Sequence, residues 1–311
     1  MLWISIVVLA TLSTAVLSLD STAVLLTPVA LALAAKLQLD RALFAYTTVW
    51  LANTASLVLP MFGLANLLAV HVLRLNAPRF AQLLWPAAVT AIAVTVAGLV
   101  VIFRRSLRGR YTASGHTDVA DRPLLVVTMA VCVLLGPAFA VGIDVTEAAA
   151  IAALVLTIGC LLRAPKLLSV QLLPWKLIVG VAALFVMVEF AQAHGLAELL
   201  GHVAGAAGTG WLQLLRLSGL AALFSNLVDN LPTYLAMEPL AAQSPVRVSA
   251  LLVGVNTGPL VTPWASLATL LWAARCRAAG LTIRWRTFAV RGALLVPTML
   301  VACTAALLPA R

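Results

Sequence analysis

A short polar stretch between two apolar runs, from Phe224 to Tyr234, limits what this chain can fold into more than any other feature. The flanking runs, 211–224 and 231–242, are each shorter than the about 20 residues that a helix needs to cross a bilayer. Polar backbone at membrane depth is tolerated only where it is buried in protein or lines a cavity. We therefore predict that the two runs form a re-entrant helical hairpin with a polar tip.

The composition places the chain among the polytopic membrane proteins. Of its 311 residues, 63% are hydrophobic and 10% are charged, whereas a soluble domain carries about 25% charged residues. The net charge of +10 comes from basic residues in short loops, which is the pattern of the positive-inside rule and not of nucleic-acid binding. The cysteines and histidines show no metal-ligand spacing, and no Walker-type phosphate loop occurs. We expect no metal, no cofactor and no ATPase activity.

The order hairpin, broken helix, plain helix occurs twice along the chain. The first copy is predicted as arms 2–18 and 23–35 around the tip 19–22, a discontinuous helix at 42–74 and a helix at 82–103. The second copy is predicted as arms 211–224 and 231–242, a segment 248–274 broken between Asn256 and Pro263, and a last helix at 288–308. Interrupted segments at matched positions of two halves are typical of secondary transporters.

Three ordinary helices, at 123–141, 146–162 and 174–193, precede the second hairpin. The predicted organisation is a first repeat at 1–103, a basic cytoplasmic loop at 104–122 and a second repeat at 123–311 that includes these scaffold helices. With that loop in the cytoplasm, most other basic loops also fall inside, and the two hairpins enter from opposite faces. We expect an all-α, inverted-repeat protein of a bacterial inner membrane, with hairpin tips that meet near the midplane.

The four breaks supply polar groups that could hold a solute without a fixed countercharge. Interrupted helix ends free backbone N–H and C=O groups, and prolines such as Pro232 and Pro259 keep the helices from closing. A hydroxylated or anionic solute, or a Na⁺ ion, suits such groups. The residues predicted to line the path are Asp20, Ser21, Thr22, Asn53, Thr54, Ser56, Asn66, Ser225, Asn226, Asp229, Asn230, Thr233, Asn256, Thr257, Thr262 and Ser266.

Asp20 and Asp229 are the only carboxylates in the four breaks, and we place each at a hairpin tip, at equivalent positions of the two repeats. In a poorly hydrated site the neutral form of a carboxylic acid is favoured, and such a group can take up and release a proton during transport. The alternative is that each aspartate caps the second arm of its hairpin by accepting from backbone N–H groups. We predict proton coupling through Asp229 and Asp20, and the two roles are compatible.

The residues of the breaks resemble those of a known family. The stretches 224–235 and 258–272 are similar to motifs of the arsenite/antimonite efflux permeases (ArsB type) of the ion transporter superfamily. The stretches 20–28 and 52–57 resemble the corresponding motifs of the first repeat, and Pro174-Trp175-Lys176 also fits. The resemblance implies the inverted-repeat fold and export of arsenite or antimonite coupled to the proton gradient. It further implies a separate soluble ATPase as an occasional partner, and a homodimer is a further option.

Two departures from the family pattern bear on function. The resemblance implies scaffold helices before the first hairpin, whereas this sequence begins at the hairpin, and a misplaced start, a truncated protein or a lost scaffold would each account for the difference. The amide that usually precedes Asp20 and the Ser-Asn pair expected near Phe62-Gly63 are also absent. The identity of the solute is therefore left open at this point.

Several alternatives remain beside arsenite export. Within transport, they are a Na⁺/H⁺ antiporter and a carboxylate or anion carrier of the same superfamily. In a different class, the chain would be a non-transporting truncated fragment or a subunit that needs a partner. A membrane-embedded enzyme is disfavoured, because no break combines Ser with His, His with Glu, or two aspartates in one segment.

Overall fold

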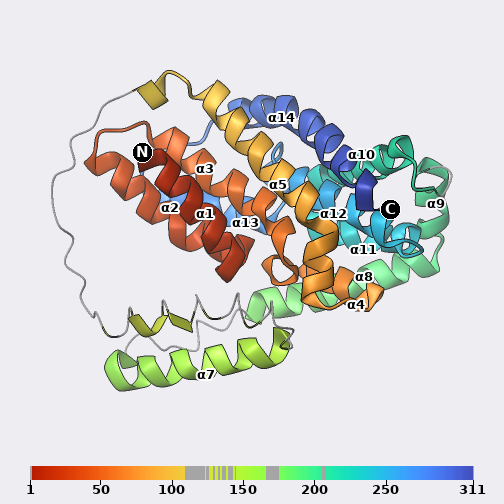
Figure 1. Cartoon of the computed structure of the whole chain (residues 1–311), viewed down its shortest axis with the longest axis horizontal. Coiled ribbons are helices and arrows are strands. Elements are labelled where there is room, and N and C mark those ends of the chain that lie inside the picture. The colour runs from red at the N-terminus through yellow and green to blue at the C-terminus, as the bar shows by residue number, and fades with distance from the viewer. Residues whose placement is uncertain are drawn as a thin grey trace.

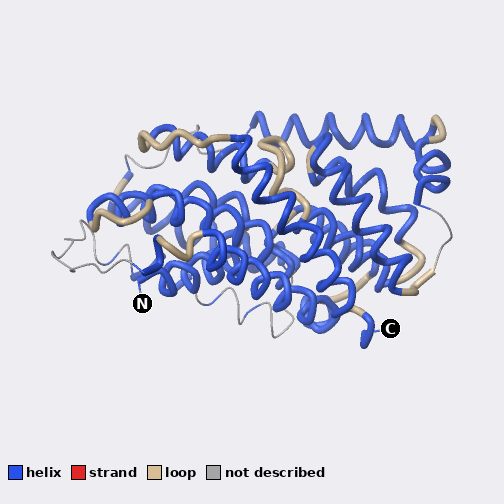
Figure 2. Tube along the Cα trace, turned by 90° about the horizontal axis from the view of Figure 1, so that it is seen from above, coloured by secondary structure: helices blue, strands red, loops and turns tan. Residues whose placement is uncertain are grey.

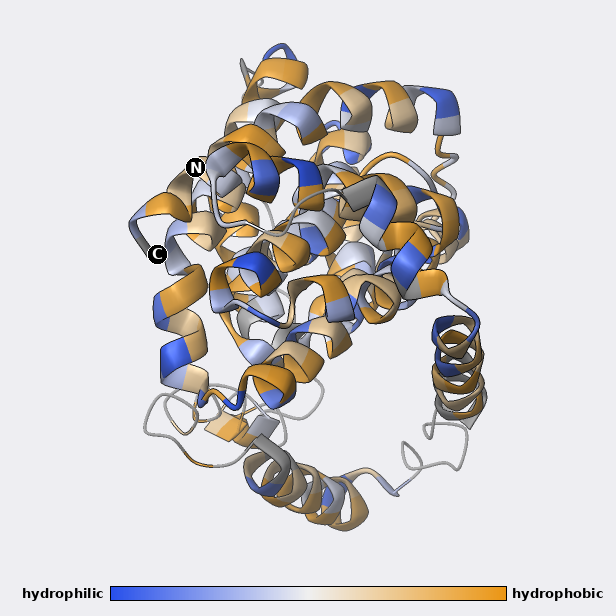
Figure 3. Cartoon of the chain, turned by 90° about the vertical axis from the view of Figure 1, so that its right-hand side faces the viewer, coloured by the Kyte–Doolittle hydropathy of each residue, from blue (hydrophilic) through white to orange (hydrophobic). Residues whose placement is uncertain are grey.

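The protein is an assembly of helices, as the hydropathy predicted. The computed structural model describes residues 2–108, 145–165, 175–204 and 208–310, with scattered positions between 123 and 143. Within these ranges there are helices and short connections but no strand (Figure 2). Four of the described helices are long and apolar enough to cross a membrane. Hydrophobic residues make up much of the helices (Figure 3), and many large apolar side chains are exposed, among them Leu12, Trp85 and Leu294. The predicted all-α polytopic membrane fold is therefore confirmed.

The first part of the chain follows the predicted order of elements. Its helices are α1 (Leu2–Leu17), α2 (Leu19–Lys36), α3 (Arg41–Thr54), α4 (Leu64–Leu73) and α5 (Ala77–Ile102). Two 3₁₀ turns, Ala55–Val58 and Pro60–Phe62, separate α3 from α4, and a third, Ser106–Arg108, follows α5. The predicted interruption of the 42–74 segment is therefore present.

The second part contains a matching series. Its helices are α7 (Val145–Arg163), α8 (Trp175–Ala193), α9 (Leu196–Ala204), α10 (Trp211–Val228), α11 (Asn230–Ala241), α12 (Pro245–Thr257), α13 (Leu267–Ala278) and α14 (Trp285–Ala306), followed by the 3₁₀ turn Leu308–Ala310. The predicted helix at 123–141 and most of the predicted loop at 104–122 lie outside the described residues. The re-entrance of the hairpins and the inverted orientation of the repeats stay predictions.

Each hairpin turns on a single residue that has a positive φ angle. Ser18 joins α1 to α2 with a φ of 83°, and Asp229 joins α10 to α11 with a φ of 126°. Angles in this region cost about 1–3 kcal/mol for residues other than glycine, so the surrounding packing must hold them. The matched geometry supports the view that the two hairpins are equivalent elements.

The hairpin tips are shorter than the sequence suggested, because the helices take in the polar residues around them. The first tip was expected at 19–22, yet α2 begins at Leu19, and the Thr22 N–H bonds to Ser18 O at 3.0 Å. The second was expected from Ser225 to Asn230, yet α10 continues to Val228. Polar side chains in the first or last turn of a helix can bond the free backbone groups there, so they do not end the helix.

Helices from the two halves of the chain pack directly against each other. α13 packs against α2 of the first hairpin, and α4 packs against α11 of the second. α5 and α14 lie side by side across the middle of the molecule (Figure 1). They run antiparallel, since Gly98 lies against Leu295 and Cys303 Sγ donates to Ala87 O at 3.5 Å. The core therefore forms between the halves as much as within each one.

α10 and α12 approach each other through glycine. A methyl group on Gly254 of α12 would lie 2.5 Å from Ala221 Cβ of α10, and one on Gly258 would lie 2.5 Å from Ala222 Cα. Small residues let the backbones of membrane helices come this close, which replaces the hydrophobic effect with dense packing. This contact holds the second hairpin against the second broken helix.

We expect Gly254→Ala to lower the melting temperature of the detergent-solubilised protein, because over-packing a tight contact costs about 1–3 kcal/mol. Gly219→Ala in α10 is the matched control, since nothing lies within 4 Å of its added methyl group. Alanine also favours a helix interior by about 1 kcal/mol over glycine. Thermal unfolding should therefore place Gly254→Ala below the wild type and Gly219→Ala level with it or above. Equal melting temperatures for the two variants would contradict the close packing of α10 on α12.

Candidate functional site

The breaks of the two repeats come together inside the bundle. A methyl group on Gly63, between the halves of the first broken helix, would lie 3.2 Å from Leu19 Cδ2 and 3.9 Å from Asn256 Oδ1. The first hairpin tip, the first break and the end of α12 therefore share one place. The second tip is also near, because the carboxyl groups of Asp20 and Asp229 are close enough to act on each other electrostatically. The meeting of the two tips near the membrane midplane stays a prediction.

A ring of three buried side chains connects the first break to α12. Ser56 Oγ donates to Asn256 Oδ1 at 3.0 Å, and Asn256 Nδ2 donates to Asn66 Oδ1 at 3.0 Å. Asn66 Nδ2 donates in turn to Ser56 O at 2.6 Å. All three side chains are buried, so the ring satisfies polar groups that lipid could not. We call these three residues the Asn256 ring.

Both broken helices end on the same dipeptide, Asn53-Thr54 in α3 and Asn256-Thr257 in α12. Each asparagine donates its side-chain N–H to the carbonyl four residues earlier, at 2.9 Å for Asn53 and 3.0 Å for Asn256. The two ends differ in their oxygens. Asn256 Oδ1 accepts from Ser56, whereas Asn53 Oδ1 is buried without a partner among the described residues.

Asn226, in the last turn of α10, joins the second hairpin to the second break. Its Nδ2 donates to Ala222 O and to Gly258 O, each at 2.8 Å. Its Oδ1 accepts from the Thr262 N–H at 2.9 Å, and Asn226 O accepts from Trp264 Nε1 at 2.9 Å. Both N–H donors of the amide are engaged, so the side chain fixes the shape of the break. We call this set of contacts the Asn226 joint.

Asp229 caps the second arm of its hairpin, as the capping alternative predicted. Its Oδ1 accepts from the Leu231 N–H at 3.1 Å, and Thr233 Oγ1 donates to Asp229 O at 2.7 Å. A carboxylate at a helix N-terminus is favoured by the helix dipole. The capping bond engages one of the two carboxylate oxygens, so it leaves Asp229 able to serve a second role.

In the first hairpin the cap is Ser18 and not Asp20. Ser18 Oγ accepts from the Ser21 N–H at 3.4 Å, and Asp20 lies two residues beyond it, in the first turn of α2. The equivalence of Asp20 and Asp229 that the sequence suggested is therefore shifted by two positions. A serine directly before a helix is a common N-cap signal, although we expected Ser18 to end the apolar arm 2–18.

Buried oxygens without a partner gather in three of the four breaks. Within the described part of the chain they are Asp20 Oδ1, Thr22 Oγ1, Asn53 Oδ1 and Ser225 Oγ. Outside the breaks, one further oxygen, of Tyr234, and two nitrogens, of Arg41 and Trp50, are also buried without a partner. An unsatisfied buried polar group costs about 1–3 kcal/mol, and native proteins keep few of them. Their concentration among the predicted path residues marks this region as the candidate solute site.

The packing of α2 on α3 places two of these oxygens, those of Thr22 and Asn53, at the same level of the helix pair. The two helices are consecutive and antiparallel, and the hydroxyls of Thr27 and Thr48 lie 3.1 Å apart. Counting back from Thr27 to Thr22 and forward from Thr48 to Asn53 covers the same length of helix. Thr22 and Asn53 therefore lie at the same level of the helix pair.

Most other predicted path residues bond within the protein, through side chain or backbone. They are Ser21, Thr54, Ser56, Asn66, Asn226, Thr233, Asn256, Thr257, Thr262 and Ser266. Asn230 begins α11 next to Asp229. Sequence reasoning missed Thr95 of α5, whose hydroxyl donates to Thr54 Oγ1 at 3.0 Å. Thr95 lies in a mostly apolar spanning helix with no break beside it, so no sequence signal marked it. No group of His, Cys, Asp or Glu in the described residues could hold a metal ion.

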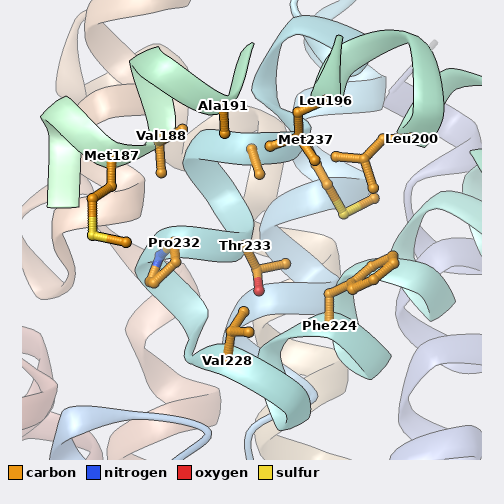
Figure 4. A pocket seen from close by; sticks show the side chains of 11 residues that line it. Met187, Val188, Ala191, Leu196, Leu200, Phe224, Val228, Pro232, Thr233 and Met237 are labelled. Carbon is orange, nitrogen blue, oxygen red and sulfur yellow. The ribbon is translucent and has the colours of Figure 1, made fainter. Parts of the chain in front are cut away.

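A cavity of about 440 Å³ lies on the other side of the second hairpin, between α8–α9 and α10–α11. Figure 4 shows its lining, in which Thr233 stands among apolar side chains such as Met187, Phe224 and Met237. Gln192 of α8 crosses to the hairpin, where its Nε2 donates to Leu235 O at 2.8 Å. The cavity is apolar, so we assign the polar solute to the breaks and not to this space.

Paired hairpins and interrupted helices that gather polar groups inside a bundle of spanning helices define a membrane transporter. The sequence profile of the citrate transporter family (CitMHS) matches residues 1–274, and the chain belongs to this family. It is also similar to proteins named arsenical pump membrane protein. The relative from Yersinia enterocolitica is 28% identical over 97% of this chain and 76% of its own length. The relative from Escherichia coli K12 is 28% identical with the same coverage.

These comparisons confirm the resemblance that the break motifs indicated. The chain is an integral membrane protein of the ion transporter type, located in a bacterial inner membrane. Family and relatives point to transport and not to catalysis.

We expect Asn226→Ala to destabilise the protein, because it leaves the Thr262 N–H without a partner, at a cost of about 1–3 kcal/mol, and removes one of the two bonds to Gly258 O. Asn230→Ala is the matched control, since it removes an amide of the same tip that forms no side-chain bond with the described residues. Melting curves in detergent and limited proteolysis should show a lower transition and faster cleavage for Asn226→Ala alone. Equal behaviour of the two variants would contradict the structural role of the Asn226 joint.

Proposed function

We propose that this chain is a proton-coupled secondary transporter that exports arsenite, antimonite or a closely related neutral inorganic solute. The observation that carries the proposal is the group of buried, unpartnered oxygens of Asp20, Thr22, Asn53 and Ser225. Relatives that cover nearly the whole chain are named arsenical pump membrane proteins, which supports the choice of solute. Association with a soluble ATPase or with a second copy of the chain remains a prediction.

The unpartnered oxygens suit a neutral trihydroxide. Carboxylate and amide oxygens, as in Asp20 and Asn53, accept hydrogen bonds, and hydroxyls, as in Thr22 and Ser225, both accept and donate. Arsenite as the trihydroxide presents the same mixture of donors and acceptors. None of the four cysteines lies in a break, so thiolate capture of arsenic is not part of the proposal. A hydrogen-bonded solute leaves faster than one held by thiolates, which favours transport over storage.

The same residues argue against a polycarboxylate such as citrate, although the family is named for it. Residues 18–22, 53–66, 225–233 and 256–266 contain no Lys, Arg or His. They contain two aspartates, which would repel a solute that carries several carboxylates. A neutral solute avoids this repulsion, which supports an uncharged hydroxylated species as the proposed solute.

Asp20 and Asp229 are the groups we assign to proton coupling. They come from different hairpins, they are the only carboxylates of the breaks, and they act on each other electrostatically. Two carboxylates repel when both are ionised, and a proton on either one removes that repulsion. Binding or release of the solute between the tips would change their separation or hydration, and this couples solute movement to proton movement.

We expect Asp229→Asn to abolish proton-coupled arsenite transport while the protein stays folded, because an asparagine oxygen can still accept the Leu231 N–H. The measurement is the change in a pH-sensitive dye when arsenite is added to everted membrane vesicles. Citrate and Na⁺ additions to the same vesicles separate the solute from the coupling ion. Wild-type proton movement in Asp229→Asn would refute the coupling role. A response to citrate or Na⁺ without one to arsenite would refute the solute.

Two threonines of α2 provide a matched test of the unpartnered oxygens. Thr22→Val removes a hydroxyl that has no partner, so we expect an unchanged or higher melting temperature together with a rise of about 2–10-fold in the KM for arsenite. Thr27→Val removes a hydroxyl that is paired with Thr48, so we expect a lower melting temperature and an unchanged KM. Arsenite uptake and thermal unfolding are measured on both variants. The opposite pattern would place the solute away from Thr22.

A further inference from the structure

The loop between α13 and α14 frames a second cavity, whose lining includes none of the path residues. Its volume is about 400 Å³, and its walls are Ala273, Arg277, Leu281, Thr282, Ile283 and Trp285. One wall residue is a cation, one carries a hydroxyl, and the other four are apolar. A cavity of this mixed character suits a ligand that is anionic at one end and apolar at the other.

The cavity lies at the level where the protein leaves the membrane. Trp285 is the first residue of α14, one of the helices apolar enough to span, and residues 281–284 are the loop that precedes it. Tryptophan at the end of a spanning helix is typical of the lipid headgroup region. Arg41 donates to Ala279 O, which attaches this loop to the start of α3. The cavity is therefore a formed part of the headgroup-level surface.

The surroundings of the cavity are strongly positive. No acidic residue follows Glu238 in the sequence, while the loop and its flanks carry Arg275, Arg277, Arg284 and Arg286, all exposed. Across the Arg41 contact the neighbouring carboxylate is Asp40, and it is engaged by the Ala42 N–H and the Ser106 hydroxyl. Arg277 consequently faces the cavity in a field that attracts an anion.

We propose that this cavity binds the headgroup of an anionic phospholipid. The Arg277 guanidinium would pair with the phosphate through two N–H donors, and Thr282 would donate its hydroxyl to the same group. Leu281, Ile283 and Trp285 would cover the glycerol and the first carbons of the acyl chains. Basic pockets at the ends of spanning helices are known to hold such lipids. A free inorganic anion would use Arg277 but leave the apolar walls uncovered, so the lining favours the lipid.

Native mass spectrometry of the whole, detergent-solubilised protein tests the site. Phosphatidylglycerol and phosphatidylcholine with identical acyl chains are titrated in parallel, and the wild type should retain phosphatidylglycerol preferentially. Removal of one surface Arg costs about fivefold in attraction to anionic lipid through charge alone. Arg286→Gln, which removes a charge from the same stretch without lining the cavity, measures this general effect. Arg277→Gln should lose clearly more than Arg286→Gln, and equal losses or equal binding of the two lipids would overturn the proposal.

Two further measurements identify the source of the phosphate and guard against misfolding. Inorganic phosphate and short-chain phosphatidylglycerol are compared as competitors for the bound lipid. Competition by inorganic phosphate at the same concentration would make this a site for soluble anions and would refute the lipid assignment. Thr282→Val alters only the hydroxyl, so it tests the site if Arg277→Gln elutes abnormally from a sizing column. It should weaken phosphatidylglycerol binding and leave phosphatidylcholine binding unchanged, and no difference from the wild type would refute the headgroup contact.

Discussion

Hydrocarbon offers no hydrogen-bond partner, so each interrupted helix of this fold must satisfy its freed backbone groups inside the protein. The Asn226 joint meets this need in the second repeat, where one side chain serves the end of α10 and the bends around Gly258 and Thr262. The Asn256 ring meets it in the first repeat, but it borrows a residue from α12. Because the first break depends on Asn256 of the second half, the first half does not complete its polar interior alone.

The order of elements could be predicted from the sequence, because hydropathy, proline and glycine act locally. Pro60 and Gly63 indicate the interruption of the first discontinuous helix, and the stretch from Gly258 to Pro263 indicates that of the second. The recurrence of hairpin, broken helix and long helix followed from the lengths of the apolar runs. The membrane makes such predictions more reliable, because unpaired backbone groups are costly in hydrocarbon. Few folds are therefore compatible with a given hydropathy pattern.

Which polar side chains bond within the protein and which stay unpartnered could not be predicted, because this depends on which helices meet and in what register. Thr22 and Thr27 are chemically identical and both buried on α2, yet Thr27 meets Thr48 and Thr22 meets no partner. Asn53 and Asn256 end matched helices, yet Ser56 contacts the side-chain oxygen of Asn256 and only the backbone oxygen of Asn53. The offset between Asp20 and Asp229 has the same origin, since one tip is capped by serine and the other by aspartate. Composition at a break reveals that polar chemistry is present but not which atoms remain available.

The single-residue tips restrict how the hairpins can move. One residue spans at most about 3.6 Å, so Ser18 and Asp229 cannot lengthen to let the arms part at the tip. Separation of the arms would first require a helix turn to unwind in a setting without water. We therefore expect the two helices of each hairpin to move as one rigid body. Opening of the central site would then come from tilting whole hairpins against the neighbouring helices.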